Sequence, residues 1–210
     1  METHFIKENI KKYYNTEANL RNSKSVKPDW KIQVREKFYN LVKQENKQTL
    51  LELGAGAGYD SQFFMQNGLN VTAIDISIEM VKHCREKCIE AYELDYYNLS
   101  CLNKKFDCIY AINTLLHVPK IDLDFVLHEI NLVLETSGLF YMSLYSGEYK
   151  ETEFVLSEVS DTPRLFVFHS ESYLRNILNN YFEIVDFEII NLESVTNKDI
   201  FYSITMKKRV

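Results

Sequence analysis

Between residues 49 and 145, short apolar runs alternate with amphipathic segments, and this order of elements constrains the fold more than any other feature of the sequence. Strands that alternate with helices form βαβ units, in which the strands build one parallel sheet and the helices cover both of its faces. We therefore predict an α/β fold. The five runs that read as strands are TLLEL (49–53), NVTAI (70–74), IEAYEL (89–94), FDCIYAI (106–112) and GLFYMSLY (138–145).

Two of the helices expected between these strands have residues suited to mark their ends. Ser77 can cap a helix over residues 78–88, and Asp122 can cap one over residues 123–135. The second segment carries a single apolar stripe at helical spacing. Gly138 then suits the end of that helix, before the fifth strand begins.

The C-terminal part of the chain breaks the alternation. After a helix predicted over about 171–180, two apolar runs follow, FEIVDFEII (182–190) and IFYSITMKKR (200–209), with only a polar loop between them. That loop is too short to hold a crossover helix, so the two strands should pair antiparallel. We therefore expect five parallel strands followed by an antiparallel hairpin.

The first 48 residues read as polar helices with a break near Lys27–Pro28. We interpret residues 1–48 as an N-terminal helical cap that contributes to the functional site, and residues 49–210 as the core. Residues 15–28 and 146–170 are the segments that we expect to be most mobile.

Charge and composition argue against several classes of protein. The net charge of −6 at pH 7 disfavours a large nucleic-acid footprint, which usually needs a basic face. The start, METHFIKENIKKYYN, is charged throughout, and no window approaches the roughly 20 apolar residues that span a membrane. We expect a soluble, cytoplasmic monomer or homodimer. We expect no metal site, because no zinc-site spacing relates Cys84, Cys88, Cys101 and Cys108.

Three glycines follow the first predicted strand in the stretch LLELGAGAGYDSQFF. Gly54, Gly56 and Gly58 let the backbone turn tightly and let a ligand approach it closely. A dinucleotide site is typically G-x-G-x-x-G, but here the third glycine comes one residue early and Tyr59 stands at the dinucleotide position. The turn therefore favours a different ligand, or it is a tight strand-to-helix connection that binds nothing.

Carboxylates end the next two predicted strands. Asp75 follows the second strand, 21 residues beyond Gly54, where an acid can accept hydrogen bonds from a ribose diol. Asp95 follows the third strand, where a carboxylate can accept a hydrogen bond from the amino group of an adenine. Either acid alone is more often a solvated strand end. Together they indicate a ligand that contains adenosine, because ligands of open α/β sheets bind along this edge.

In combination, these motifs resemble the class I S-adenosylmethionine-dependent methyltransferases that act on small molecules. The resemblance covers residues 50–148 densely, through LLELGAGAGYD, TAIDISIEMV, YELDYYNL, FDCIYAINTLLHVP and GLFYMSLYSGE, and extends more weakly over the C-terminal hairpin. It implies a Rossmann-like, seven-stranded, mostly parallel sheet with helices on both faces and an antiparallel final strand. It also implies S-adenosylmethionine as the cofactor and a small-molecule methyl acceptor.

The resemblance implies a role for each matching residue. Many relatives carry arginine where this chain has Tyr59, so Arg21 or Tyr14 is a candidate to bind the cofactor carboxylate. The other matching residues are Glu52, Gly54, Ala55, Gly56, Gly58, Ala111, Ile112 and Asn113 for the methionine part of the cofactor, and Asp75, Ile76, Met80, Asp95 and Tyr96 for its adenosine part.

His117, in NTLLHVP just after the fourth strand, is the candidate general base, because imidazole titrates near neutrality. It would equally serve by packing against the cofactor or by capping the next turn. Much of the acceleration in methyl transfer comes from placing the acceptor beside the activated methyl group. We expect the acceptor pocket between the N-terminal helices and residues 146–170, where Arg164 and His169 either meet an acidic acceptor group or are ordinary surface charges.

Other functions compete with this interpretation. A nicotinamide oxidoreductase is disfavoured by Tyr59 and by the C-terminal hairpin. An enzyme that methylates base amines in nucleic acids is expected to show an Asn/Asp-Pro-Pro-aromatic motif, where this chain has INTLLH; an RNA substrate of another kind stays open. The same fold also serves in catalytically silent cofactor sensors or scaffolds. The sequence does not indicate whether O, N, S or C would be methylated.

Overall fold

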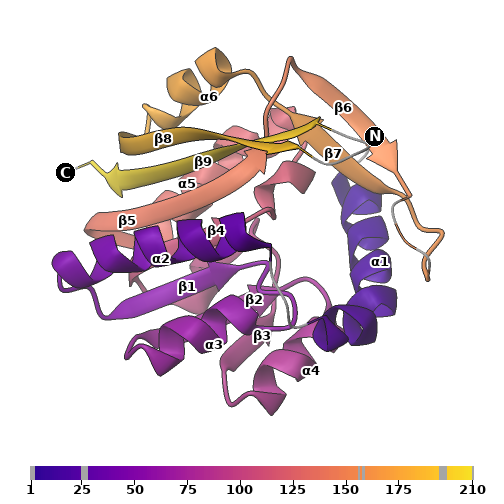
Figure 1. Ribbon diagram of the computed structural model, residues 1–210, viewed down its shortest axis with the longest axis horizontal. Coiled ribbons are helices and arrows are strands. Elements are labelled where there is room, and N and C mark those ends of the chain that lie inside the picture. Colours follow the sequence, from indigo (N-terminus) through magenta and orange to yellow (C-terminus); the bar gives the residue numbers. More distant parts are fainter. Residues whose placement is uncertain (1–2, 25–27, 156, 158, 194–197, 210) are drawn as a thin grey trace.

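The computed structural model describes residues 3–24, 28–155, 157, 159–193 and 198–209. At its centre is a seven-stranded sheet in the order β3-β2-β1-β4-β5-β9-β8 (Figure 1). β1 to β5 run parallel, and β9 is inserted antiparallel between β5 and β8, so the predicted sheet and its hairpin are confirmed. The strands of this sheet are β1 Thr49–Leu53, β2 Asn70–Asp75, β3 Glu90–Glu93, β4 Phe106–Ile112, β5 Leu134–Tyr145, β8 Phe182–Glu193 and β9 Lys198–Lys208.

Helices cover both faces of the sheet, because successive residues of a strand point to opposite sides. In β1, Leu50 belongs to the core that contains Phe38 of α2 and Phe64 of α3, whereas Leu51 belongs to the core under α5 and α6. Burial on both faces explains why the central strands read as continuous apolar runs. The helices are α1 Thr3–Ser23, α2 Asp29–Gln44, α3 Tyr59–Gln66, α4 Ile78–Glu86, α5 Leu123–Val133 and α6 Glu171–Leu178.

α1 stands across the carboxyl ends of the parallel strands instead of lying on a face of the sheet (Figure 1). Ile6 and Ile10 in its first half pack on Leu165 and Val167, and Ala18 in its second half packs on Met80 of α4. α2 differs from α1, since it packs into the core of the sheet. The predicted break lies between these two helices, and the polar residues 15–23 continue α1 as regular helix.

A second, two-stranded antiparallel sheet forms from β6 Lys150–Phe154 and β7 Arg164–Phe168. We did not predict these strands. The sequence of β6, KETEF, is mostly polar and mostly exposed, so it lacks the apolar pattern that marks a strand. The sequence of β7, RLFVF, is largely buried and packs partly on α1.

The start and end of α5 differ from the prediction. Asp122 makes no capping hydrogen bond, because residues 120–122 form a 3₁₀ turn and its carboxylate instead accepts from the hydroxyls of Thr3 (2.7 Å) and Tyr97 (3.0 Å). The helix ends at Val133, and Gly138 lies inside β5; Ser137 adopts the left-handed backbone, with φ of 58°. The cap of α4 is confirmed, since Ser77 Oγ accepts from the backbone N–H of Met80 at 3.2 Å.

None of the helices in the described ranges has both the length and the apolar character that crossing a bilayer requires.

Candidate active site

A cavity of about 570 Å³ opens at the carboxyl ends of β1, β2 and β4. Side chains of α1 and β7 close its other side, and its volume is in the range of small-molecule sites. Among the residues predicted for cofactor binding and for the general base, Gly58 and Ala111 do not line it. The predicted residues that line it are Tyr14, Arg21, Glu52, Gly54, Ala55, Gly56, Asp75, Ile76, Met80, Asp95, Tyr96, Ile112, Asn113 and His117.

The three glycines of the turn all have left-handed backbones, but they serve different purposes. A Cβ atom on Gly54 would lie 2.2 Å from Thr114 Oγ1, and one on Gly58 would lie 2.9 Å from Cys84 Sγ and from Ile89 Cδ1. These two glycines therefore allow close packing of neighbouring elements. A Cβ on Gly56 would meet no atom within 4 Å, so this glycine leaves its backbone open towards the cavity. Ala111 is fully buried in the core of the sheet.

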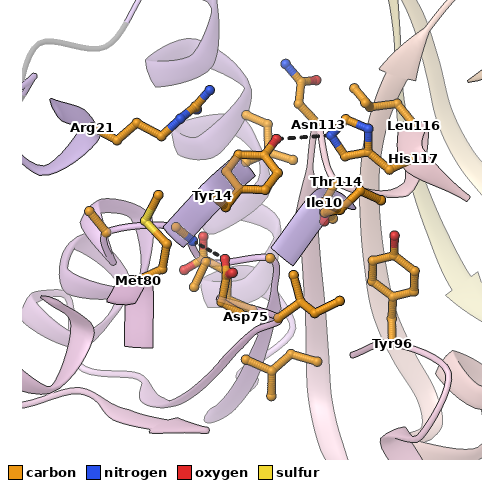
Figure 2. Close-up of a pocket in the computed structure, with 18 of the residues that line it drawn as sticks. Ile10, Tyr14, Arg21, Asp75, Met80, Tyr96, Asn113, Thr114, Leu116 and His117 are labelled. Atoms are coloured by element: carbon orange, nitrogen blue, oxygen red, sulfur yellow. Dashed lines mark hydrogen bonds between the residues drawn. The ribbon is translucent and has the colours of Figure 1, made fainter. Parts of the chain in front are cut away.

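Asp75 holds the glycine turn in place from the end of β2 (Figure 2). Its carboxylate accepts hydrogen bonds from the backbone N–H groups of Gly56 (2.8 Å) and Ser77 (2.9 Å). Burial raises the pKa of Asp75 to about 6, and the two backbone hydrogen bonds oppose that rise. Since a carboxylate offers about four lone-pair directions, Asp75 retains capacity for the hydroxyls of a diol.

Asp95 and Tyr96 lie at the neighbouring strand end, as predicted. Asp95 accepts hydrogen bonds from the Tyr97 N–H (3.0 Å) and the Asn98 side chain (2.7 Å), and it forms an ion pair with Lys7 of α1. Burial raises the pKa of Tyr96, so its hydroxyl keeps its proton and can donate it to a ligand. This strand end therefore offers both an acceptor and a donor to a flat polar group.

His117 is buried and its two ring nitrogens have different partners. Nδ1 lies 2.6 Å from the carbonyl oxygen of Leu165, which can only accept, so the ring proton belongs on Nδ1. Nε2 lies 3.0 Å from the hydroxyl of Tyr14, which must then donate to it (Figure 2). Arg164 Nη1 donates to the same hydroxyl at 2.9 Å. Burial lowers the pKa of His117 to about 3, and the charge of Arg164 lowers it further.

The remaining predicted polar residues are also held in place. Arg21 Nε lies 3.4 Å from Glu17 Oε2, and Arg21 Cζ lies 5.0 Å from the ring centre of Tyr14. Its side chain lines the cavity from α1. Glu52 is buried and accepts a hydrogen bond from Ser61. Asn113 has a left-handed backbone and accepts from Ser143 Oγ at 2.7 Å.

His169 does not line the cavity, so the hypothesis that it meets an acceptor is wrong, and it is not a surface charge either. Its buried ring stacks on Tyr173 and makes no hydrogen bond within the described residues. Burial lowers the pKa of His169 to about 4, which keeps it neutral.

One face of α1 contributes more of the site than the sequence analysis found. Lys7, Ile10 and Glu17 line the cavity together with the predicted Tyr14 and Arg21. Their spacing of three, four, three and four residues places all five side chains along one side of a helix. Extending this helical period from Tyr14 and Arg21 would have found them. Thr114 and Leu116, which also line the cavity, follow β4 in no regular pattern.

Residues 50–138 match a protein family described as "Methyltransferase domain". The chain is also similar to the malonyl-[acyl-carrier protein] O-methyltransferase of Hamiltonella defensa, with 31% identity over 138 residues, 64% of this chain and 53% of that protein. It therefore spans about half the length of this curated relative.

Solved structures share the fold. The 1,6-didemethyltoxoflavin-N1-methyltransferase of Burkholderia thailandensis, with bound S-adenosylhomocysteine, has a TM-score of 0.74 and 17% identity, over 100% of this chain and 92% of that one. The magnesium protoporphyrin IX methyltransferase of Synechocystis PCC 6803, with bound S-adenosylmethionine, has a TM-score of 0.69 and 15% identity, over 96% of both chains. The sheet order of this chain agrees with these structures, and residues 50–138 match the methyltransferase family, so the chain has the fold that these methyltransferases share.

Proposed function

We propose that this protein transfers the methyl group of S-adenosylmethionine to a small-molecule acceptor. The observation that carries the proposal is the open backbone at Gly56, held by Asp75, at the carboxyl edge of the sheet. When bound, the cofactor supplies a methyl group on a sulfonium that is already activated for transfer. By their names, the relatives above act on malonyl-[acyl-carrier protein], 1,6-didemethyltoxoflavin and magnesium protoporphyrin IX. This supports a small acceptor but assigns no atom to be methylated.

The arrangement supports a specific division of roles around the cofactor. Asp75 would accept hydrogen bonds from the ribose diol. Asp95 and Tyr96, with Ile76 and Met80, would hold the adenine. Arg21 suits the methionine carboxylate better than Tyr14 does, because the Tyr14 hydroxyl already donates its proton to His117. The remaining contacts, to the methionine part, would come from Glu52, Gly54, Ala55, Gly56, Ile112 and Asn113.

Catalysis would rest mainly on positioning. A general base needs a free lone pair and a pKa near the working pH. The Nε2 lone pair of His117 faces the hydroxyl of Tyr14, and its pKa is about 3. We therefore favour His117 as a positioning residue that orients Tyr14, and the general-base role stays a prediction.

The same cavity supports the idea that the N-terminal segment is a cap over the core. α1 supplies cavity residues, whereas α2 packs in the core of the sheet, so within residues 1–48 the capping role would belong to α1. We further propose that the protein acts in the cytoplasm, as a monomer or homodimer, and without nucleic acid. The net charge of −6 supports the last point.

The experiment is an acceptor screen that measures release of S-adenosylhomocysteine. Purified protein is incubated with S-adenosylmethionine and a panel of small acids, amines, thiols and phenols, with total RNA as a separate sample. Asp75→Asn should abolish turnover, while Asp186→Asn, at a partly exposed surface ion pair with Lys37, should retain it. Cofactor binding without turnover on any acceptor would support a silent sensor, and turnover on RNA alone would overturn the small-molecule proposal.

A further inference from the structure

Arg164, at the start of β7, lines the cavity and is only 5% exposed. Among the lysines and arginines of the described ranges, it alone is classed as buried. Two other cations of the cavity wall have ionic partners: Lys7 pairs with Asp95, and Arg21 with Glu17. Arg164 has no carboxylate within 4 Å among the described residues.

The hydrogen bonds of Arg164 are also incomplete. A guanidinium has five N–H donors, and the hydroxyl of Tyr14 takes one of them at 2.9 Å. Its Nε is buried and finds no partner in the described part of the chain. The hydroxyl of Tyr14 is neutral, so it does not offset the charge of Arg164.

Burying a charge without a counter-charge is costly, so a buried arginine that lacks one at a cavity wall indicates an anionic ligand. Aromatic rings surround the guanidinium: the ring centres of Tyr13, Phe166 and Tyr14 lie 3.8, 4.9 and 5.3 Å from its Cζ. Cation–π contacts of this kind offset part of the cost and keep water away. They supply no negative charge, so the charge of Arg164 stays available to a ligand.

We propose that Arg164 binds a carboxylate of the methyl acceptor, an inference that rests on the proposed function. A carboxylate carries one negative charge and two acceptor oxygens, which match the charge and the paired N–H donors of a guanidinium. The cofactor also has a carboxylate, but only one, and we assign that carboxylate to Arg21 of α1. Arg164 lies instead with Phe166, on the strand whose Leu165 carbonyl holds His117.

The test uses protein saturated with S-adenosylhomocysteine and two probe pairs of matched shape: benzoate with benzamide, and 3-phenylpropionate with 3-phenylpropionamide. Binding is followed by isothermal titration and by protein-observed NMR. In the wild-type protein at least one carboxylate should bind about tenfold or more tightly than its amide. Arg164→Met should remove that preference and leave the Kd of S-adenosylmethionine within about twofold. Arg164→Lys, which keeps the charge but not the fork of donors, should retain part of the preference.

The possible results separate the inference from the function on which it rests. If wild-type protein binds neither S-adenosylmethionine nor S-adenosylhomocysteine, the proposed function fails. If it binds them but shows no preference for either carboxylate, the proposal for Arg164 is overturned and the function stands. If Arg164→Met weakens S-adenosylmethionine tenfold or more, the cofactor carboxylate is the partner of Arg164, which also overturns the proposal. The wild-type comparison needs no variant, so a variant that misfolds does not remove the test.

Discussion

Replacing Gly56 by alanine separates the backbone strain of the glycine turn from its role in ligand approach. Gly56 has a φ of 56°, and an added methyl group would meet no protein atom within 4 Å. Gly68, between α3 and β2, is a matched control: its φ is 92°, its added methyl also meets nothing, and it does not line the cavity. Both substitutions therefore cost the same kind of strain, but only one places a methyl group in the cavity.

The magnitudes follow from that difference. An L-residue with left-handed backbone costs about 1–2 kcal/mol, which lowers Tm by roughly 2–8 °C in a chain of this size. Both Gly56→Ala and Gly68→Ala should show this loss. Overpacking against a ligand costs about 1–3 kcal/mol, so Gly56→Ala should also weaken S-adenosylmethionine by roughly 5- to 150-fold.

Thermal unfolding of the ligand-free variants measures the loss of Tm, and isothermal titration of each folded variant measures its affinity for S-adenosylmethionine. The reasoning is refuted if Gly56→Ala binds S-adenosylmethionine as tightly as Gly68→Ala does. In that case the cofactor does not approach the backbone of the turn. A loss of affinity in both variants would mean that strain in the fold, and not the methyl group in the cavity, governs binding.

Three further predictions concern the residues behind the turn. Gly58→Ala adds clashes with Cys84 and Ile89 to the strain, so urea unfolding should show a loss of about 2–5 kcal/mol; a loss no larger than that of Gly68→Ala would contradict the packing role. S-adenosylmethionine affinity should fall as the pH drops through about 6, because protonated Asp75 loses acceptor capacity, and titrations of Asp75→Asn should give weak binding without this pH step. For His117, whose pKa falls from 6.5 unfolded to about 3 folded, the unfolded chain binds the extra proton between these values. Its contribution to stability is therefore complete above pH 6.5 and lost as the pH falls towards 3. Denaturant titrations at a series of pH values should show that the free energy of unfolding changes less with pH in His117→Asn than in the wild-type protein.

The parallel strands could be predicted closely because burial on both faces leaves a clear apolar signature. TLLEL and FDCIYAI coincide with β1 and β4 at both ends. The end of α5 could not be predicted, because nothing local distinguishes a glycine in a strand from one that closes a helix. There Ser137 takes the left-handed backbone, while Gly138 makes room for the Leu134 side chain and the Glu135 carbonyl.

The candidate site was predicted best where its residues lie at the ends of strands that pair with each other. Gly56 and Asp75 are 19 residues apart in the sequence. Gly56 follows β1 and Asp75 ends β2, and these strands pair directly, so the sheet brings the two residues together. The link from Arg164 through Tyr14 to His117 joins three segments whose contact no local pattern encodes. β7 brings Arg164 to the cavity wall. We did not predict β7, because its partner strand β6 is polar and lacks the apolar pattern of a strand.

Isothermal titration of the wild-type protein with S-adenosylmethionine, S-adenosylhomocysteine and NADH tests the central claim most directly. If the cavity beside Gly56 and Asp75 is a methyl-donor site, both adenosyl compounds should bind at one site per chain and NADH should not bind. Binding of NADH, or no heat with either adenosyl compound, would contradict that assignment.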